Sequence, residues 1–357
     1  MKNAKNFIWI LTGLVSILLI INLYLTLSTG YIADGLKIKA EELARPGEIQ
    51  LVAIIDPSCT DCFDILRIIE SVKTANVELT SQQIIEYTDE QAQVLIEKYN
   101  IEKIPTIIVT GEINKEGSEI SGLEEKSDAL VFTNLDPVYF DLSSKEYKGR
   151  VQIQLITNSD CENCYDMSTF IDAIKDLVSI SSEKLIELDD AKELIEKYSL
   201  TELPAIIISG DIELYPETAS KLEAIGTFVG EDLVLSAKLN PPYWDLTEDK
   251  ALGLVSLTYI TDESCEDCYN VSIHKKVLEN YGVFIAEETT IDISSDEGQA
   301  LKKKYDLTKV PTIIASEDLK YYSGIEDVWE QVGTIEKDGN YVFRELDLVS
   351  KEYTTLE

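Results

Sequence analysis

The segment Ser58-Cys59-Thr60-Asp61-Cys62 contains two cysteines separated by two residues, and two further segments share this pattern. They are Asp160-Cys161-Glu162-Asn163-Cys164 and Ser264-Cys265-Glu266-Asp267-Cys268. The three pairs use all six cysteines of the 357-residue chain, and their first cysteines lie 102 and 104 residues apart. This spacing is about the length of one small domain. It predicts three tandem copies of one domain, which we call repeats 1, 2 and 3.

The sequence that flanks each cysteine pair is repeated as well. An apolar run rich in β-branched residues precedes each pair, at residues 49–55, 151–157 and 254–261. A segment with helical periodicity follows, so the pattern predicts a buried strand and then a helix. Further along, a Lys-Tyr pair leads to an apolar residue and a proline, which open another apolar run. The apolar residue and the proline are Ile104-Pro105, Leu203-Pro204 and Val310-Pro311 in the three repeats.

The repeats predict domains at residues 47–145, 146–247 and 248–357, each long enough for one modest core. Matching segments with proline and aromatic residues, 135–142 and 239–246, close the first two repeats. Proline with polar flanks favours a stiff, extended link. We expect the aromatic residues of these links to pack one repeat on the next, and a binding role is the alternative.

An apolar segment at residues 7–27 is long enough for a helix that crosses the hydrocarbon core of a bilayer. Lys2 and Lys5 precede it without an acidic residue, which favours a cytoplasmic N-terminus. We therefore expect a single-pass anchor in the cell membrane, a polar stalk at residues 28–46, and an extracytoplasmic location for the rest. A cleaved signal peptide is the alternative, although its apolar core is ordinarily shorter.

The composition limits the classes of partner. With 66 acidic and 31 basic residues the formal charge is −35, which repels phosphate backbones and predicts that the chain does not bind nucleic acid. An apolar content of 45% excludes wholesale disorder. The one histidine, His274, restricts any Cys-His nucleophile to repeat 3, and we expect it on a helix surface. We expect no cofactor.

The predicted order of strand, cysteine pair and helix has a chemical meaning. At a helix start, unpaired backbone N–H groups and the helix dipole stabilise a thiolate on the first cysteine. The second cysteine follows one turn later and can attack a mixed disulfide on the first. The attacking candidates are Cys59, Cys161 and Cys265, and the resolving candidates are Cys62, Cys164 and Cys268.

Together, these motifs resemble the thioredoxin family over nearly all of residues 47–357. The resemblance implies an α/β fold with a mixed central sheet flanked by helices. It also implies that the proline of each Ile/Leu/Val-Pro dipeptide is cis and lies beside the disulfide, where the backbone holds a substrate strand. The implied substrate-binding residues are Ile104, Pro105, Leu203, Pro204, Val310 and Pro311.

A tandem array behind an anchor is similar to extracytoplasmic disulfide oxidoreductases and protein disulfide isomerases. This similarity implies that the partners are protein thiols and disulfides, together with a membrane redox protein.

Two departures from the family pattern affect the expected reactivity. The residues between the cysteines are acidic or polar, and the buried acidic residue of the thioredoxin strand is replaced by Ala53, Leu155 and Tyr259. A carboxylate 4 Å from a thiolate costs about 1 kcal/mol in water-like surroundings, and a helix terminus returns about 0.3–1 kcal/mol. We therefore expect first-cysteine pKa values near the free value of about 8.5, and hence weak oxidants with stable disulfides. Repeat 2, with Ala205 after its proline, is expected to be the least active.

Three functions stay open at this point. The first is a membrane-anchored thiol–disulfide oxidoreductase or isomerase. The second is a binding scaffold whose cysteine pairs are structural disulfides, which the acidic spacers favour. The third is a metal site that shares four sulfurs between repeats, because a structural zinc site takes four ligands and one repeat offers only two sulfurs. We expect no metal site within a single repeat.

Overall fold

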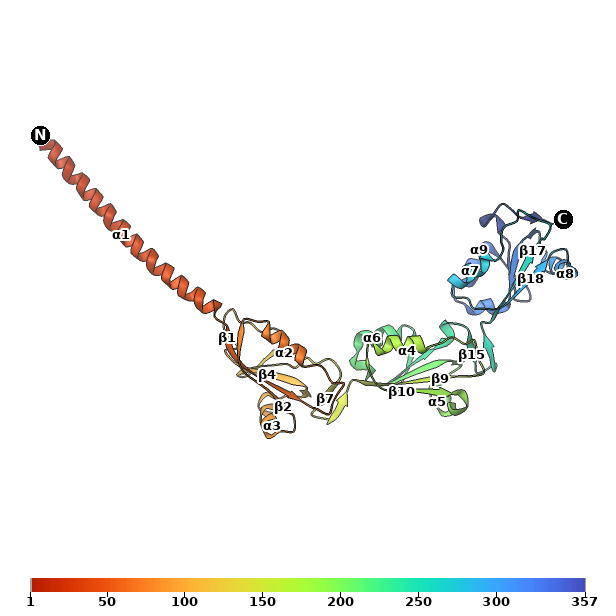
Figure 1. Ribbon diagram of the computed structural model, residues 1–357, viewed down its shortest axis with the longest axis horizontal. Helices are drawn as coiled ribbons and strands as arrows, with labels where there is room; N and C mark the ends of the chain where they lie inside the picture. The colour runs from red at the N-terminus through yellow and green to blue at the C-terminus, as the bar shows by residue number, and fades with distance from the viewer. Residues whose placement is uncertain (1, 357) are drawn as a thin grey trace. The chain divides into compact units, whose positions relative to one another are not determined.

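The computed structural model describes residues 2–356, with side chains at residues 12–28, 31–238 and 240–356. Contacts within the chain divide it into two compact units, Met1–Lys148 and Gly149–Glu357. The first contains repeat 1, and the second contains repeats 2 and 3 (Figure 1). The domain limits near residues 145 and 247 stay predictions.

Helix α1 (Lys2–Ala44) precedes the first repeat (Figure 1). Its part from Thr12 to Ala44 is long and apolar enough to cross a membrane, and its large apolar side chains from Leu14 to Leu27 are exposed. The helix continues through most of the predicted stalk. The side chains of Lys2 and Lys5, on which the predicted orientation depends, lie outside the described residues. A signal sequence would satisfy the same criterion of length and composition.

Repeat 1 has a five-stranded mixed sheet in the order β2-β1-β4-β6-β5. The strand that leads to the cysteines, β1, is parallel to β2 and antiparallel to β4, which follows Pro105. The sequence of strand β1 is an apolar run because the strand lies in the core, where Ile49, Leu51 and Ala53 are fully buried. The elements are β1 (Gly47–Ile55), α2 (Leu66–Lys73), β2 (Val77–Glu86), α3 (Glu90–Tyr99), β3 (Lys103–Ile104), β4 (Thr106–Gly111), β5 (Glu124–Lys126), β6 (Ala129–Val131), β7 (Tyr139–Asp141) and β8 (Glu146–Lys148).

Repeat 2 has the same sheet, in the order β10-β9-β12-β14-β13. It differs by an additional helix, α6, before the last hairpin, and by short 3-10 turns. The elements are β9 (Arg150–Thr157), α4 (Ser168–Lys175), β10 (Ser179–Glu187), η1 (Leu188–Asp190), α5 (Lys192–Tyr198), β11 (Glu202–Leu203), β12 (Ala205–Gly210), η2 (Ile212–Leu214), α6 (Pro216–Glu223), β13 (Gly226–Val229), β14 (Asp232–Ser236), η3 (Ala237–Leu239), β15 (Tyr243–Asp245) and β16 (Lys250–Leu252).

Repeat 3 again has this sheet, in the order β18-β17-β20-β22-β21. All three sheets are mixed and carry helices, so the predicted α/β fold with three tandem copies is confirmed. The elements are β17 (Val255–Thr261), α7 (Ile273–Asn280), β18 (Ile285–Asp292), α8 (Asp296–Tyr305), β19 (Lys309–Val310), β20 (Thr312–Ala315), η4 (Glu317–Tyr321), α9 (Ile325–Val332), β21 (Gly333–Ile335), β22 (Tyr341–Phe343), η5 (Leu346–Leu348) and β23 (Thr354–Thr355).

The Lys-Tyr pairs end a helix in the same way in each repeat. The next residue is left-handed and caps the helix, as at Asn100 with φ 47°. The tyrosine hydroxyl then donates to an aspartate of the last hairpin of the sheet, and these bonds tie the helix to the sheet. The pairs are Tyr99–Asp128, Tyr198–Asp232 and Tyr305–Asp338, at 3.1, 2.7 and 2.9 Å.

A short strand near the end of each repeat lies outside the main sheet. Strands β7, β15 and β23, which we call the cover strands, pair antiparallel with β3, β11 and β19, the strands just before the prolines. Phe140 of β7 is buried against Tyr87 and Tyr147, which lie in the same compact unit. Packing of the first link between repeats 1 and 2 stays a prediction. Tyr243 of β15 is buried in the core of repeat 2 and also meets Tyr321 of repeat 3, with ring centres 6.1 Å apart.

Candidate functional site

Each cysteine pair forms a disulfide in a turn that follows the central strand. The prediction that the pairs lie at helix starts is wrong, because α2, α4 and α7 begin four or five residues after the second cysteine. Just before each helix an Asp or Asn side chain accepts a backbone N–H: Asp64 from Leu66, Asp166 from Ser168 and Asn270 from Ser272, at 3.1, 2.8 and 3.0 Å. In repeats 1 and 3 an aspartate also lies three residues before the first cysteine. Asp56 Oδ1 accepts hydrogen bonds from the backbone and hydroxyl of Ser58, at 2.8 and 2.6 Å, and a side chain that bonds locally competes with helix formation. The helix N–H groups and dipole are therefore displaced from the sulfurs.

The structure places each proline loop beside its cysteine pair. The bonds Ile104–Pro105, Leu203–Pro204 and Val310–Pro311 are cis, as the resemblance implied. In repeat 1, Cys59, Cys62 and Pro105 line one recess of about 330 Å³. In repeat 2, Cys164 Sγ lies 3.9 Å from the carbonyl oxygen of Leu203. In repeat 3, the hydroxyl of Tyr269, the residue after Cys268, donates to the carbonyl of Pro311 at 2.9 Å.

The cover strand binds both sides of this site through the backbone. The residue after each second cysteine donates its N–H to the cover segment: Phe63 to Val138, Tyr165 to Pro242 and Tyr269 to Glu352, at 2.8, 2.7 and 3.0 Å. Four residues further along the cover segment, a leucine N–H donates to the pre-proline strand: Leu142 to Glu102, Leu246 to Thr201 and Leu356 to Thr308. The backbone edge at which the resemblance implies a substrate strand is therefore paired with the chain's own strand in all three repeats.

A sequence signal for the cover strands exists, although it was not recognised for repeat 3. Aligned by these bonds, the segments read Tyr139-Phe140-Asp141-Leu142, Tyr243-Trp244-Asp245-Leu246 and Tyr353-Thr354-Thr355-Leu356. In repeats 1 and 3 a lysine of the pre-proline strand lies over the tyrosine ring: Lys103 over Tyr139 and Lys309 over Tyr353, at 4.3 and 4.4 Å. Repeat 2 has Glu202 at this position instead, and Glu202 pairs with Lys238 at 3.1 Å.

Carboxylates surround the disulfides of repeats 1 and 3. Asp61 Oδ1 lies 3.5 Å from Cys59 Sγ. Although burial opposes the shift, hydrogen bonds from Ser58 and Tyr147 lower the pKa of Asp56. Hydrogen bonds from Ser264 and Thr354 lower the pKa of Asp262, its counterpart in repeat 3. Both groups are therefore ionised at neutral pH, and their charge opposes the formation of a thiolate nearby.

The position of the acidic residue in the thioredoxin strand is apolar or aromatic here. Ala53 is fully buried and Leu155 packs against the core of repeat 2. Tyr259 is buried, and its hydroxyl donates to Glu288 at 2.8 Å. Burial, followed by the hydrogen bond to Glu288, raises the pKa of Tyr259 above its ordinary range, so its hydroxyl stays protonated.

The prediction that His274 lies on a helix surface is wrong. The side chain is buried, with Nε2 3.1 Å from the hydroxyl of Tyr269 and its ring 4.4 Å from that of Phe343. Burial lowers the pKa of His274 to about 4, so the imidazole is neutral at physiological pH. Helical periodicity could have placed it on the inner face of α7, four residues before the buried Leu278.

The first cysteines differ in accessibility. Cys161 is only 9% exposed and counts as buried, whereas Cys59 and Cys265 are partly exposed. The expectation that repeat 2 is the least active stays a prediction. Among the residues that the structure describes, no three His, Cys, Asp or Glu side chains come together as a metal site.

No family model matches the chain, and no curated protein matches it. Among solved structures, ERdj5 form II is 12% identical over 78% of this chain, with a TM-score of 0.16, and the chain spans 39% of that structure's length. The zinc-bound form of human ERp44 is 13% identical, covering 82% of this chain and 86% of its own, with a TM-score of 0.15. A protein disulfide oxidoreductase from Aeropyrum pernix K1 is 18% identical, covering 48% and 80%, also with a TM-score of 0.15.

Likeness at this level carries no argument about activity. The sheet order, the cysteine turns and the cis-prolines decide the fold. Each repeat has a thioredoxin-like fold. In all three, the cysteine pair and the proline loop lie side by side, as in this fold. The cover strands occupy the pre-proline edge, which the motifs did not predict.

The contact between Asp61 and Cys59 predicts the effect of removing one charge. In the reduced full chain, Asp61→Asn should lower the pKa of the Cys59 thiol by about 0.5–1 unit, because about 1 kcal/mol of repulsion is removed. The rate of alkylation of Cys59 against pH, read by peptide mass, measures the shift. Glu125→Gln, on edge strand β5, is the matched control and should leave the curve in place. A curve for Asp61→Asn that overlays the unaltered one would contradict the electrostatic argument.

Proposed function

We propose that the chain is a membrane-anchored thiol–disulfide oxidoreductase or isomerase that acts outside the cytoplasm on protein thiols and disulfides. The observation that carries the proposal is the open recess of repeat 1, where the disulfide and the cis-proline loop line one surface. The same pairing of disulfide and cis-proline loop occurs in repeats 2 and 3. Three copies of one thiol site support a shared redox chemistry.

The proposed exchange proceeds in two steps in repeat 1. The Cys59 thiolate attacks a substrate disulfide, so that a mixed disulfide forms and one substrate sulfur leaves as a thiolate. The Cys62 thiolate then attacks Cys59 Sγ. The Cys59–Cys62 bond forms, the mixed disulfide breaks, and the second substrate sulfur leaves with the electron pair. Both substrate thiolates take protons from water, so the substrate disulfide is reduced and the dithiol is oxidised.

The electrostatics favour one direction of this reaction. Ionised carboxylates lie near the sulfurs of repeats 1 and 3, and no helix N-terminus compensates them. A poorly stabilised thiolate form favours the disulfide, so the reduced pairs should be good reductants and poor donors of disulfides. This charge distribution fits a reductase or isomerase better than an oxidase. Such an enzyme would receive electrons from a membrane redox partner.

A binding scaffold with inert disulfides is the second candidate. The observation that favours it is the cover strand, which pairs with the pre-proline edge in every repeat. A substrate strand would have to replace this pairing or approach the sulfurs from the recess side. The two candidates differ in whether a mixed disulfide ever forms.

The experiment traps that mixed disulfide. The reduced full chain with Cys62→Ser should accumulate an adduct with insulin, used as the disulfide-bearing probe, because the resolving sulfur is absent. The adduct is measured on non-reducing gels and located by peptide mass. The matched variant Cys59→Ser should give at least tenfold less adduct in repeat 1. If neither Cys62→Ser nor the corresponding variants Cys164→Ser and Cys268→Ser form an adduct, the scaffold function replaces the proposal.

The anchor is tested separately. Helix α1 exposes a long apolar surface, and insertion in a bilayer would bury it. We expect the full chain to remain with membranes after extraction at alkaline pH and to keep the mass of the uncleaved protein. Release in the alkaline wash, or a shorter chain that lacks the apolar part of α1, would contradict an anchor.

A further inference from the structure

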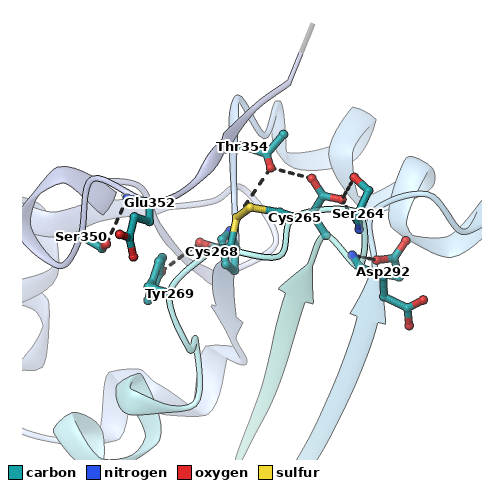
Figure 2. Close-up of a disulfide and its surroundings, with 11 residues drawn as sticks. Ser264, Cys265, Cys268, Tyr269, Asp292, Ser350, Glu352 and Thr354 are labelled. Carbon is teal, nitrogen blue, oxygen red and sulfur yellow. Dashed lines mark hydrogen bonds between the residues drawn. A yellow bond between two sulfur atoms is a disulfide. The ribbon is translucent and has the colours of Figure 1, made fainter.

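Repeat 3 differs from the others at one position of its cover strand. Thr354 occupies the register position of Phe140 in repeat 1 and Trp244 in repeat 2. Its Oγ1 lies 3.7 Å from Cys268 Sγ, the sulfur of the second cysteine (Figure 2). Repeat 3 therefore places the Thr354 hydroxyl beside its resolving cysteine. Repeats 1 and 2 carry an aromatic ring at this position of the cover strand.

The direction of the Thr354 hydroxyl is fixed by a second contact. Thr354 donates its proton to Asp262 Oδ2 at 2.6 Å, a charge-assisted hydrogen bond (Figure 2). The other oxygen of Asp262 is held by the backbone and hydroxyl of Ser264, at 3.0 and 2.6 Å. Since the hydroxyl proton points to the carboxylate, the oxygen lone pairs of Thr354 remain for Cys268. They can accept a proton from a thiol, but they cannot stabilise a thiolate.

The charges on the adjoining segments do not favour a thiolate either. The hydroxyl of Tyr269 contacts His274 Nε2 and donates to the carbonyl of Pro311. The two lysines next to the cover strand, Lys309 and Lys351, pair with Asp347 at 2.8 and 3.1 Å. The other charged residues of the cysteine turn, of the end of β18 and just before Tyr353 are all acidic. They are Glu263, Glu266, Asp267, Asp292 and Glu352.

We propose that Thr354, oriented by Asp262, is a positioning residue that keeps reduced Cys268 as a thiol and so prolongs the mixed disulfide on Cys265. The inference rests on the proposed function and assigns repeat 3 a different role from repeat 1. Repeat 3 holds a substrate thiol for longer before it releases it, which suits isomerisation.

The affected step is the second of the exchange. Cys268 must lose its proton before its sulfur attacks Cys265 Sγ, forms the Cys265–Cys268 bond and expels the substrate sulfur as a thiolate. In the reduced site, a bond from the Cys268 thiol to Thr354 Oγ1 would make that proton harder to remove. Rotation of the hydroxyl to donate to the thiolate would break the bond to Asp262, so the geometry opposes the reactive form.

Repeat 2 supplies a natural comparison. The residue three before its first cysteine is Asn158, where repeat 3 has Asp262. An amide can donate to the threonine oxygen, which frees the hydroxyl proton for a sulfur. The substitution Asp262→Asn should therefore reverse the hydroxyl and allow Thr354 to stabilise the thiolate of Cys268.

The test follows the mixed disulfide in the reduced full chain after mixing with oxidised glutathione. Samples are quenched in acid, and the peptide that contains Cys265 and Cys268 is read by mass. Asp262→Asn should shorten the lifetime of the glutathione adduct about tenfold, and Thr354→Val about two- to threefold. In the double variant, Asp262→Asn should shorten the lifetime of the adduct by a smaller factor, because no Thr354 hydroxyl remains to turn toward Cys268. Thr354→Ser should keep the original lifetime, and Thr355→Val on the same strand is the matched control.

Slower release in Asp262→Asn or Thr354→Val would overturn the inference and indicate a proton relay through Thr354 instead. Unchanged lifetimes in both would overturn it as well. The alkylation rate of Cys268 against pH is the second readout, because it needs no exchange reaction: its pKa should fall by about one unit in Asp262→Asn. If Cys265 never forms an adduct in the unaltered chain, the proposed function fails for repeat 3, and an unshifted alkylation curve then overturns the inference independently.

Discussion

The backbone hydrogen bond from the residue after each second cysteine to the cover segment holds the functional site together. It fixes the cysteine turn to a strand that also pairs with the pre-proline edge, so three segments distant in sequence meet at one point. In repeat 1 the aromatic core around Phe140 supports the same strand. Access to the sulfurs, the position of the proline loop and the side chains that face the disulfide all depend on this arrangement.

Electrostatics then set the reactivity of the sulfurs. In all three repeats the helix begins four or five residues after the second cysteine, and in repeats 1 and 3 an aspartate three residues before the first cysteine adds a charge near the disulfide. A helix terminus stabilises an anion only within its first turn. Both effects raise the free energy of the thiolate form and favour the disulfide. The chain thus combines the thioredoxin-like scaffold with a charge distribution that suits a reductant.

Much of the fold could be predicted from the repeated sequence, because strands, helix ends and prolines depend on local patterns. The runs before the cysteines form β1, β9 and β17, and the prolines lie beside the disulfides. The helix start was predicted wrongly because the local bonds that precede it, such as the one from the Leu66 N–H to Asp64, depend on side-chain geometry. The cover strand of repeat 3 was missed because Tyr353 and Leu356 become a signal only when the register with β19 is known. His274 was misplaced because its polar character suggested a surface position, although its place four residues before Leu278 puts it on the inner face of α7.

The reduction potential of each pair decides whether the chain is a reductant, a potent oxidant or an inert scaffold. The full chain is equilibrated with glutathione buffers or stronger thiol buffers, the thiols are trapped by alkylation, and each peptide is read by mass. The account predicts that Cys59–Cys62 and Cys265–Cys268 switch reversibly at the reducing end of the range of working oxidoreductases, about −300 to −200 mV. Disulfides that all stay oxidised well below about −300 mV, or a pair that switches near the −120 mV of a potent oxidant, would contradict it.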